Sequence, residues 1–385
     1  MVRELVEQEK PLAYILGTQP FHPLPVDLLV GPPTLIPRPE TEHWVNLLLE
    51  RLILKHSPRH HRKSRAPFRI LDIGTGSGCI ALGLTYGLAA RTRDRASEVV
   101  VQTVAVDQST AALSLARENA ERCGLTVESS NGGGDSSSSD QCAARGSRIA
   151  FRQADLFSPA FTSSVLSALR ASSSSSPHST SAKSSSRPDD RHSPISPPLF
   201  DLVVSNPPYI PLHEYEALEP SVREWEDRRA LVGEAAATVQ GSDGSSSAAF
   251  DDGLIFYRRI VNLLETLLRP PSATSASEGS GASTAGQGED EGEDGGERER
   301  LAPIPEDNYH PPCVAFEVGQ GQARAVEQML LDWRPSWDLP SSSASSASAE
   351  DADAGRRGAW RLETELVVDP WGVERAVFAS WVQKQ

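Results

Sequence analysis

A cluster of groups able to hold a planar amine lies in the stretch 200–211. Asn206 offers a side-chain oxygen that accepts and an NH2 group that donates. Pro207 and Pro208 make the turn rigid and leave their carbonyl oxygens free to accept, while Tyr209 adds a flat aromatic face with a polar tip. One proton of a planar NH2 group could go to the Asn206 side chain and the other to the Pro207 carbonyl. The nitrogen lone pair would then point at an electrophile.

The residues before Asn206 predict where this cluster lies in the fold. The apolar run 202–204 is typical of a short buried strand, which the two prolines end because they cannot continue a sheet ladder. Ligands bind outside the carboxyl ends of strands in open α/β sheets. A structural turn after a strand is the alternative interpretation, and the strand-to-turn context favours a functional one.

A glycine loop supplies a second set of functional groups. A predicted strand over 68–74 leads into Gly74, Gly76 and Gly78, and a helix opens at Cys79. Such a loop holds anionic or polar ligands against backbone N–H groups. The dinucleotide fingerprint needs its third glycine one position later, where this chain has Cys79. The chain lacks a Gly-Lys-Ser/Thr sequence, which excludes a Walker phosphate loop.

Three acidic residues follow successive predicted strands: Asp72 stands before the glycines, Asp107 ends the second strand and Asp155 ends the third. Asp107 can accept both ribose hydroxyl protons. Asp155, with Leu156 and Phe157 beside it, can read an adenine amino edge. This set describes an adenosine without a pyrophosphate, which fits S-adenosyl-L-methionine better than NAD. The candidate cofactor-binding residues are Asp72, Gly74, Thr75, Gly76, Ser77, Gly78, Asp107, Asp155, Leu156 and Asn206.

Alternating strands and helices predict an α/β fold with a doubly wound, mostly parallel sheet and an antiparallel edge. Strands are expected over 68–74, 99–107, 149–155, 200–205, 312–319, 360–368 and 373–381. Helices are expected over 1–10, 42–54, 79–88, 111–123, 252–268 and 322–333, with Thr41 and Ser109 as N-caps and a hairpin over 21–30. We expect an N-terminal helical remnant plus hairpin in 1–45 and a catalytic domain in 46–385. Low-complexity inserts near 128–147, 171–198, 235–249, 271–309 and 340–358 fall between these elements, where insertions are tolerated.

Composition narrows the function classes. The 385 residues carry a formal net charge of -15, which argues against binding nucleic acid through the overall field, although much of the acid lies in 288–297. The four cysteines form no Cys-x-x-Cys pair, and His60 and His61 lie in a basic linker, so we expect free thiols and no metal site. No apolar run reaches the length of a membrane span.

The chain resembles the HemK/PrmC family of release factor glutamine methyltransferases from about residue 8 onward. The motifs that carry the resemblance are at 11–17, 35–42, 70–78, 105–107 and 205–210, with shorter agreements at 252–254, 317–319 and 372–375. The Asn-Pro-Pro-Tyr sequence is shared with adenine methyltransferases, whereas Ile-Pro-Arg38-Pro-Glu40-Thr-Glu is specific to this family.

The resemblance implies a class I methyltransferase fold with S-adenosyl-L-methionine as cofactor and the Gly-Gly-Gln glutamine of a peptide chain release factor as substrate. The cofactor would contact Gly74 to Gly78, Asp107, Leu156 and Asn206. The glutamine would meet Asn206 to Tyr209, with Arg38 and Glu40 shaping the wall. Family members also carry a small N-terminal helical domain, most of which is absent here, so we expect further sequence upstream. The inserts suggest a eukaryotic, mitochondrial type, with the cytoplasm as the alternative.

Three alternatives stay open. An N6-adenine methyltransferase of DNA or RNA would use the same Asn-Pro-Pro-Tyr sequence but needs a basic groove with stacking aromatics, and only a short basic patch at 59–65 is present. A non-catalytic methyltransferase-fold scaffold is disfavoured by the intact Asp72, glycines, Asp107 and Asn206. An NAD oxidoreductase is the most distant alternative.

Overall fold

The computed structural model describes residues 2–55, 66–93, 99–128, 146–174, 199–233, 252–271, 310–336 and 360–383. Most of each expected insert lies outside these residues, as do Cys142, His60, His61 and the acidic run 288–297. The three cysteines that are described, Cys79, Cys123 and Cys313, are buried and free, as expected.

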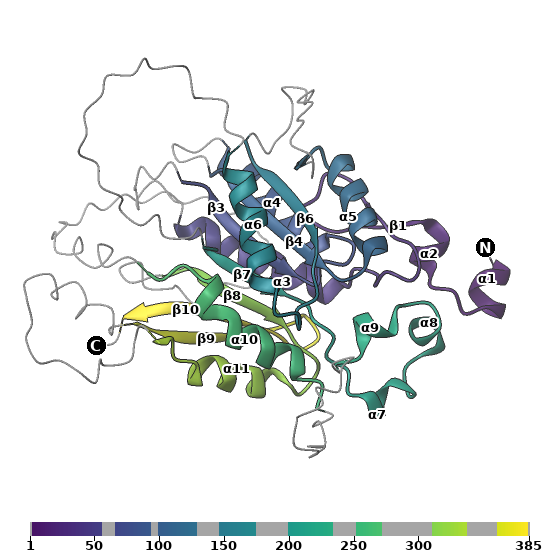
Figure 1. Ribbon diagram of the computed structural model, residues 1–385. Helices are drawn as coiled ribbons and strands as arrows, with labels where there is room; N and C mark the ends of the chain where they lie inside the picture. The colour runs from purple at the N-terminus through teal and green to yellow at the C-terminus, as the bar shows by residue number, and fades with distance from the viewer. Residues whose placement is uncertain are drawn as a thin grey trace, which may run out of the picture.

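An eight-stranded sheet forms the centre of the fold (Figure 1). Its spatial order is β5 (Thr126–Val127), β6 (Arg148–Gln153), β4 (Val101–Asp107), β3 (Phe68–Ile73), β7 (Leu202–Ser205), β8 (Pro312–Glu317), β10 (Glu374–Gln383) and β9 (Trp360–Val368). The strands from β5 to β8 pair in parallel, and β10 pairs antiparallel with both β8 and β9. The prediction of a mostly parallel sheet with an antiparallel edge is confirmed.

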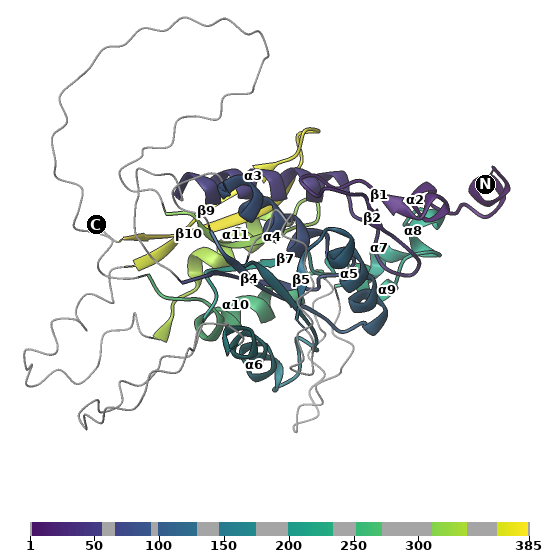
Figure 2. The same cartoon turned by 90° about the horizontal axis from the view of Figure 1, so that it is seen from above.

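Helices cover both faces of the sheet. One apolar cluster joins the sheet to α3 (Pro39–Lys55), α4 (Cys79–Thr92) and α5 (Thr110–Arg122). A second cluster joins the opposite face to α6 (Phe161–Ser174), α10 (Ile255–Leu267) and α11 (Ala323–Asp332). Figure 2 shows α3 above the sheet and α6 and α10 below it. Alternate residues of β3 contribute to the two clusters, as the period of two in a strand requires.

Small elements form a lobe beside the sheet (Figure 1). From the N-terminal region come α1 (Val2–Glu7), α2 (Leu12–Leu16), β1 (Thr18–Gln19) and β2 (Leu28–Leu29). The segment after β7 supplies α7 (Leu212–Tyr215), α8 (Pro220–Arg223) and α9 (Arg228–Leu231). The two segments dock on each other: the Asp227 amide donates to the Pro33 carbonyl at 2.7 Å, and the Trp225 indole donates to the Gln8 carbonyl at 3.1 Å.

Several expected boundaries are wrong. Helix α3 begins at Pro39 rather than at residue 42, because proline is well tolerated in a first helical turn. Thr41 is therefore inside the helix and not its N-cap. Strand β6 ends at Gln153, so Asp155 belongs to the loop that follows.

Helix α6 was not expected, and it continues to Ser174, past the point where an insert was expected to begin. Its serine-rich sequence hides an apolar stripe at positions 161, 165 and 169, which is buried against the sheet. The prediction of Ser109 as the N-cap of α5 is confirmed, because its side chain accepts a hydrogen bond from the Ala112 amide.

Candidate functional site

Three residues from three parallel strands lie in a row at the carboxyl edge of the sheet. Ile73 pairs with Ser205, and Ser205 pairs with Phe316. The next residues along these strands, Gly74, Asn206 and Glu317, are therefore neighbours at the same level. In agreement, a Cβ atom added to Gly74 would lie 3.8 Å from the Asn206 carbonyl oxygen.

The glycine loop lies on one side of Asn206. Its first two amides, from Gly74 and Thr75, both donate to the Val106 carbonyl at the end of β4, at 2.8 and 2.9 Å. Gly76 has a φ of 54°, and a Cβ atom placed on it would meet no atom within 4 Å. The loop thus has open space above it, as a loop that holds a ligand requires.

Asp72 lies fully buried beneath this loop. Its Oδ2 atom accepts a hydrogen bond from the Thr75 hydroxyl at 2.7 Å, whereas Oδ1 is buried and has no partner among the described residues. Burial raises the pKa of this carboxyl group to about 7, while the Thr75 hydroxyl and the Ala81 amide lower it. An unpartnered buried oxygen is costly in a protein, so this atom favours a ligand that brings a donor.

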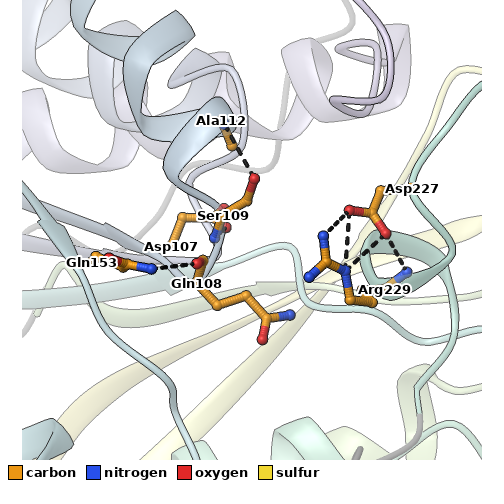
Figure 3. Close-up of polar contacts among 7 residues, drawn as sticks. All are labelled: Asp107, Gln108, Ser109, Ala112, Gln153, Asp227 and Arg229. Atoms are coloured by element: carbon orange, nitrogen blue, oxygen red, sulfur yellow. Dashed lines mark hydrogen bonds and ion pairs between the residues drawn. The ribbon is translucent and has the colours of Figure 1, made fainter.

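Asp107 ends β4 beside the loop, as predicted (Figure 3). Its Oδ2 accepts a hydrogen bond from the Gly76 amide at 2.9 Å, and its Oδ1 accepts one from the Ser109 amide at 2.8 Å. Each carboxylate oxygen has a further lone pair, so the group can still accept two hydroxyl protons. Burial raises the pKa of Asp107, while the two amides lower it.

An ion pair lies opposite Asp107, and the sequence reasoning missed it. Arg229 makes a fork with Asp227, with a shortest nitrogen–oxygen distance of 2.7 Å (Figure 3). The charge of Asp227 helps to raise the pKa of Asp107, and the charge of Asp107 helps to raise the pKa of Arg229. The start of α9 therefore faces the end of β4. No sequence pattern connects positions 107 and 227, which are brought together only by the docking of the lobe.

The loop after β6 contains the other expected cofactor residues. Asp155 is exposed, and its Oδ1 accepts a hydrogen bond from the Phe157 amide at 2.9 Å. Leu156 is buried, and Phe157 packs edge-on against Phe256 with 5.1 Å between ring centroids. The Ala154 amide donates to the Asp107 carbonyl at 3.0 Å, which places this loop beside the end of β4.

The turn that follows β7 leaves its polar groups available. No hydrogen bond within the described residues uses the Asn206 side chain or the Pro207 carbonyl oxygen. Asn206 is partly exposed. These are the two acceptors that the sequence assigned to a planar NH2 group.

Tyr209 is held in place from three sides. Its carbonyl accepts a hydrogen bond from the Gln322 side chain at 2.9 Å, and the same Gln322 nitrogen donates to the Asp252 carbonyl at 3.1 Å. A Cβ atom on Gly319 would lie 2.9 Å from the Tyr209 ring, and one on Gly253 would lie 2.0 Å from the Tyr209 carbonyl oxygen. Only glycine fits at these two positions, which explains the Asp-Gly-Leu and Glu-Val-Gly sequences near the site.

Glu317 lies on the other side of Asn206 and was not among the predicted site residues. Its Oε2 accepts hydrogen bonds from the Thr41 hydroxyl at 2.6 Å and from the Trp44 indole at 2.8 Å. Burial raises the pKa of Glu317 to about 7, partly offset by these two donors. The sequence could have identified Glu317, because this acid comes near the end of a predicted strand and directly before the Val-Gly of the Glu-Val-Gly sequence.

The wall of the site contains a buried ion pair. The Arg38 guanidinium lies 2.6 Å from a Glu226 oxygen, with the Glu226 side chain 0% exposed and that of Arg38 29% exposed. The charge of Glu40 contributes to raising the pKa of both Tyr209 and Glu317, so Glu40 also lies near the site. A cavity is lined by residues 35–38 and Thr41 on one side and by residues 74–77, Cys79, Ile80 and Asn206 on the other.

The structure thus brings the glycine loop, Asp72, Asp107, Asn206 and Arg38 to one edge of the sheet. Among the described residues no group of histidine, cysteine or acidic side chains could hold a metal ion. No helix in the described part of the chain is long and apolar enough to cross a membrane.

Replacing Arg38 by methionine is expected to lower the free energy of unfolding by about 2 kcal/mol, because the buried Glu226 carboxyl group loses its cation. Glu226→Gln is the matched variant and should cost less, since the partly exposed guanidinium can turn to water. Urea denaturation of both variants measures the difference. If Glu226→Gln lowers the free energy of unfolding as much as Arg38→Met or more, the buried carboxyl group does not depend on Arg38 for its stability.

Glu317 should make stability depend on pH. Because its pKa is raised to about 7 in the folded state, the folded protein holds this proton more tightly than the unfolded chain. Its contribution to stability is therefore fully present at low pH and is lost as the pH rises through about 7. The pKa of Asp72 is also raised to about 7, so its titration changes stability in the same direction. The wild type is therefore compared with Glu317→Gln, which removes the contribution of Glu317 alone. We expect the wild type to lose stability relative to this variant between pH 5 and pH 8, and a constant difference would show that Glu317 does not titrate there.

Comparison with known proteins identifies similar sequences in bacteria. The release factor glutamine methyltransferase of Geobacter sulfurreducens is 33% identical over 263 residues, which is 68% of this chain and 58% of that protein. The proteins of the same name from Bacillus cereus and Haemophilus influenzae are 29% identical over 280 residues and 41% identical over 121 residues. These matches cover 73% and 31% of this chain, and 65% and 38% of the respective relatives. The chain thus spans less than two thirds of the length of each of these relatives.

No family model matches the chain. Among solved structures, the one titled "delta-N METTL16 MTase domain" has a TM-score of 0.34 and 10% identity, and the match covers 94% of this chain and 90% of that one. The fold is assigned from the strand order and the two helical layers described above. The chain is similar in sequence to the release factor glutamine methyltransferases, and its strand order is the class I methyltransferase architecture that this resemblance implied.

Proposed function

We propose that this protein transfers a methyl group from S-adenosyl-L-methionine to the side-chain amide nitrogen of a glutamine. The substrate is the Gly-Gly-Gln glutamine of a peptide chain release factor. The proposal rests chiefly on one observation: Asn206 lies between the glycine loop and Glu317 at the carboxyl edge of the sheet, and its side chain makes no hydrogen bond to the described residues. The names of the bacterial relatives support the choice of substrate.

The residues around the glycine loop fit the cofactor. The Asp72 oxygen without a partner matches an ammonium donor, the open space at Gly76 admits the ligand backbone, and Asp107 keeps lone pairs for ribose hydroxyls. In this proposal Asp155 and Leu156 would flank the adenine. When bound, S-adenosyl-L-methionine supplies an electrophilic methyl group on a sulfonium.

Asn206 and Pro207 would activate the acceptor. An amide nitrogen is a weak nucleophile because its lone pair is delocalised into the carbonyl. When the Asn206 side-chain oxygen and the Pro207 carbonyl each accept one N–H proton, the amide plane is fixed and electron density shifts onto nitrogen. The nitrogen becomes positive as its new bond to carbon forms, so these acceptors help more in the transition state than in the ground state. As the nitrogen takes the methyl group, the electron pair of the broken carbon–sulfur bond would stay on sulfur as a neutral thioether. The nitrogen would then release one proton to water and become a secondary amide.

Tyr209, Pro208, Arg38 and Glu40 complete the acceptor site in this proposal. The Tyr209 ring packs beside the acceptor amide, and its position is fixed by Gly319 and by Gln322. Holding two reactants at near-attack distance can supply several kcal/mol of a barrier. The mechanism needs no histidine or cysteine, and Cys79 is unsuited to one because it is buried, with its thiol pKa raised by burial to about 12.

Two further parts of the proposal rest on the resemblance alone. Residues 1–45 contribute to the substrate-binding helical region, and residues 46–385 form the catalytic domain. The protein acts in mitochondria, with the cytoplasm as the alternative, and fractionation of cells that express the tagged full-length protein distinguishes the two.

A methyl-transfer assay tests the function directly. The protein is incubated with labelled S-adenosyl-L-methionine and a purified mitochondrial release factor, and in parallel with a factor whose Gly-Gly-Gln glutamine is replaced. Label on the unaltered factor alone is the expected result. Label on DNA or RNA instead would favour an adenine methyltransferase, and cofactor binding without transfer to either would favour a non-catalytic scaffold.

Asn206→Ala and Asp107→Ala should separate the acceptor site from the cofactor site. We expect Asn206→Ala to reduce transfer by at least 100-fold, because it removes an acceptor aimed at developing charge, and to leave the Kd for the cofactor unchanged. Asp107→Ala should weaken cofactor binding by about tenfold or more, through the loss of a charged acceptor. Isothermal calorimetry and the transfer assay measure the two effects. Full activity of Asn206→Ala would exclude the role given to it here.

A further inference from the structure

A tryptophan is presented at the rim of the proposed active site. Trp371 lies in the turn between β9 and β10, and 67% of it is exposed. Val368, at the end of β9, is 46% exposed beside this turn. Tryptophan is enriched in protein–protein interfaces, where it is among the residues that most often dominate the binding energy.

The turn that carries Trp371 is rigid. The Asp369 side chain accepts hydrogen bonds from the Trp371 and Val373 amides, both at 2.9 Å, and pairs with Arg375 at 3.1 Å. The backbone closes the turn on both sides, with the Asp369 amide donating to the Val373 carbonyl and the Gly372 amide donating to the Asp369 carbonyl. Gly372 has a φ of 84°, which favours glycine. The backbone that carries the indole is thus fixed before any partner arrives.

The turn projects from the same edge of the sheet as Asn206. Strand β10 runs antiparallel to β8, so its start lies at the carboxyl end of β8, where Ala376 pairs with Glu317. The Val318 amide donates to the Arg375 carbonyl at 2.9 Å, and the charge of Arg375 acts on the pKa of Tyr209. The tip of this hairpin, in yellow, stands clear of the rest of the ribbon in Figure 2. Strand β10 lies two strand spacings of about 4.8 Å from β7, and Trp371 precedes Ala376 by five residues, which carries it beyond the level of Asn206, so the two residues are roughly 15–20 Å apart.

We propose that Trp371 is a docking residue for the protein substrate, against which the backbone beside the acceptor glutamine packs; this inference rests on the proposed function. About five extended residues span the distance from Asn206 to the indole. Glycines beside the glutamine have no side chains, so the face of an indole can lie directly on their peptide groups. A rigid aromatic side chain at the rim gains contact area at little entropic cost, which is the property of residues that dominate binding.

The test compares Trp371→Ala and Trp371→Phe with Leu54→Ala. Leu54 is also exposed, at 49%, but it lies at the far end of α3 from the site. We expect Trp371→Ala to raise KM for the release factor by about tenfold or more, with kcat and the Kd for the cofactor unchanged. Trp371→Phe should restore most of the affinity, and Leu54→Ala should behave as the wild type.

A second measurement separates docking from chemistry. Binding of the release factor is measured in the Asn206→Ala background, with and without Trp371→Ala, so that no transfer occurs. A matching rise in Kd supports the inference. An unchanged KM and Kd in the Trp371→Ala variants would overturn it while the proposed function stands. Failure of the wild type to methylate would instead overturn the proposed function, and failure of the Asn206→Ala protein to bind the factor as well would overturn both.

Discussion

The parallel register of β3, β7 and β8 is the constraint on which the site depends. Through this register the glycine loop, Asn206 and Glu317 follow one another across the edge of the sheet, one strand apart. A shift of two residues in any of these pairings would carry its polar residue about 7 Å along the strand. The buried strand residues on both faces prevent such a shift, because they fill two separate apolar clusters. The chemistry at the edge is thus positioned by packing in the middle of the sheet.

A second layer of contacts holds the walls around this row. The segment before α3 and the segment before α9 are joined by the bond from the Asp227 amide to the Pro33 carbonyl and by the Arg38–Glu226 ion pair. The first turn of α3 is in turn tied to the end of β8 through Thr41, Trp44 and Glu317. These contacts connect positions up to 276 residues apart in the chain, the separation between Thr41 and Glu317. These contacts explain the Pro-Arg-Pro-Glu-Thr sequence: its prolines restrict the backbone, and Arg38 and Thr41 bind Glu226 and Glu317.

Several buried acids near the site have raised pKa values for the same reason. Asp72, Asp107 and Glu317 are all desolvated, and each is compensated by donors from neighbouring elements rather than by a cation in contact. Such an arrangement costs stability, since ionising a buried carboxyl group is unfavourable. Carboxyl groups with shifted pKa values cluster at functional sites, where a ligand can complete their hydrogen bonding.

The sequence by itself determined the fold class, the glycine loop, the strand that ends in Asp107 and the Asn206 turn. These follow from local patterns: apolar runs, glycines and prolines act on the chain within a few residues. The sequence analysis missed α6 because its serines mask the apolar stripe, and it misplaced the start of α3 because capping patterns do not distinguish a proline in the first turn from one before it. Only the tertiary structure brought Glu317 against Thr41, Glu226 against Arg38 and Arg229 opposite Asp107. These pairs join residues far apart in the chain, and their contacts depend on how the sheet and the lobe pack, which no local pattern records.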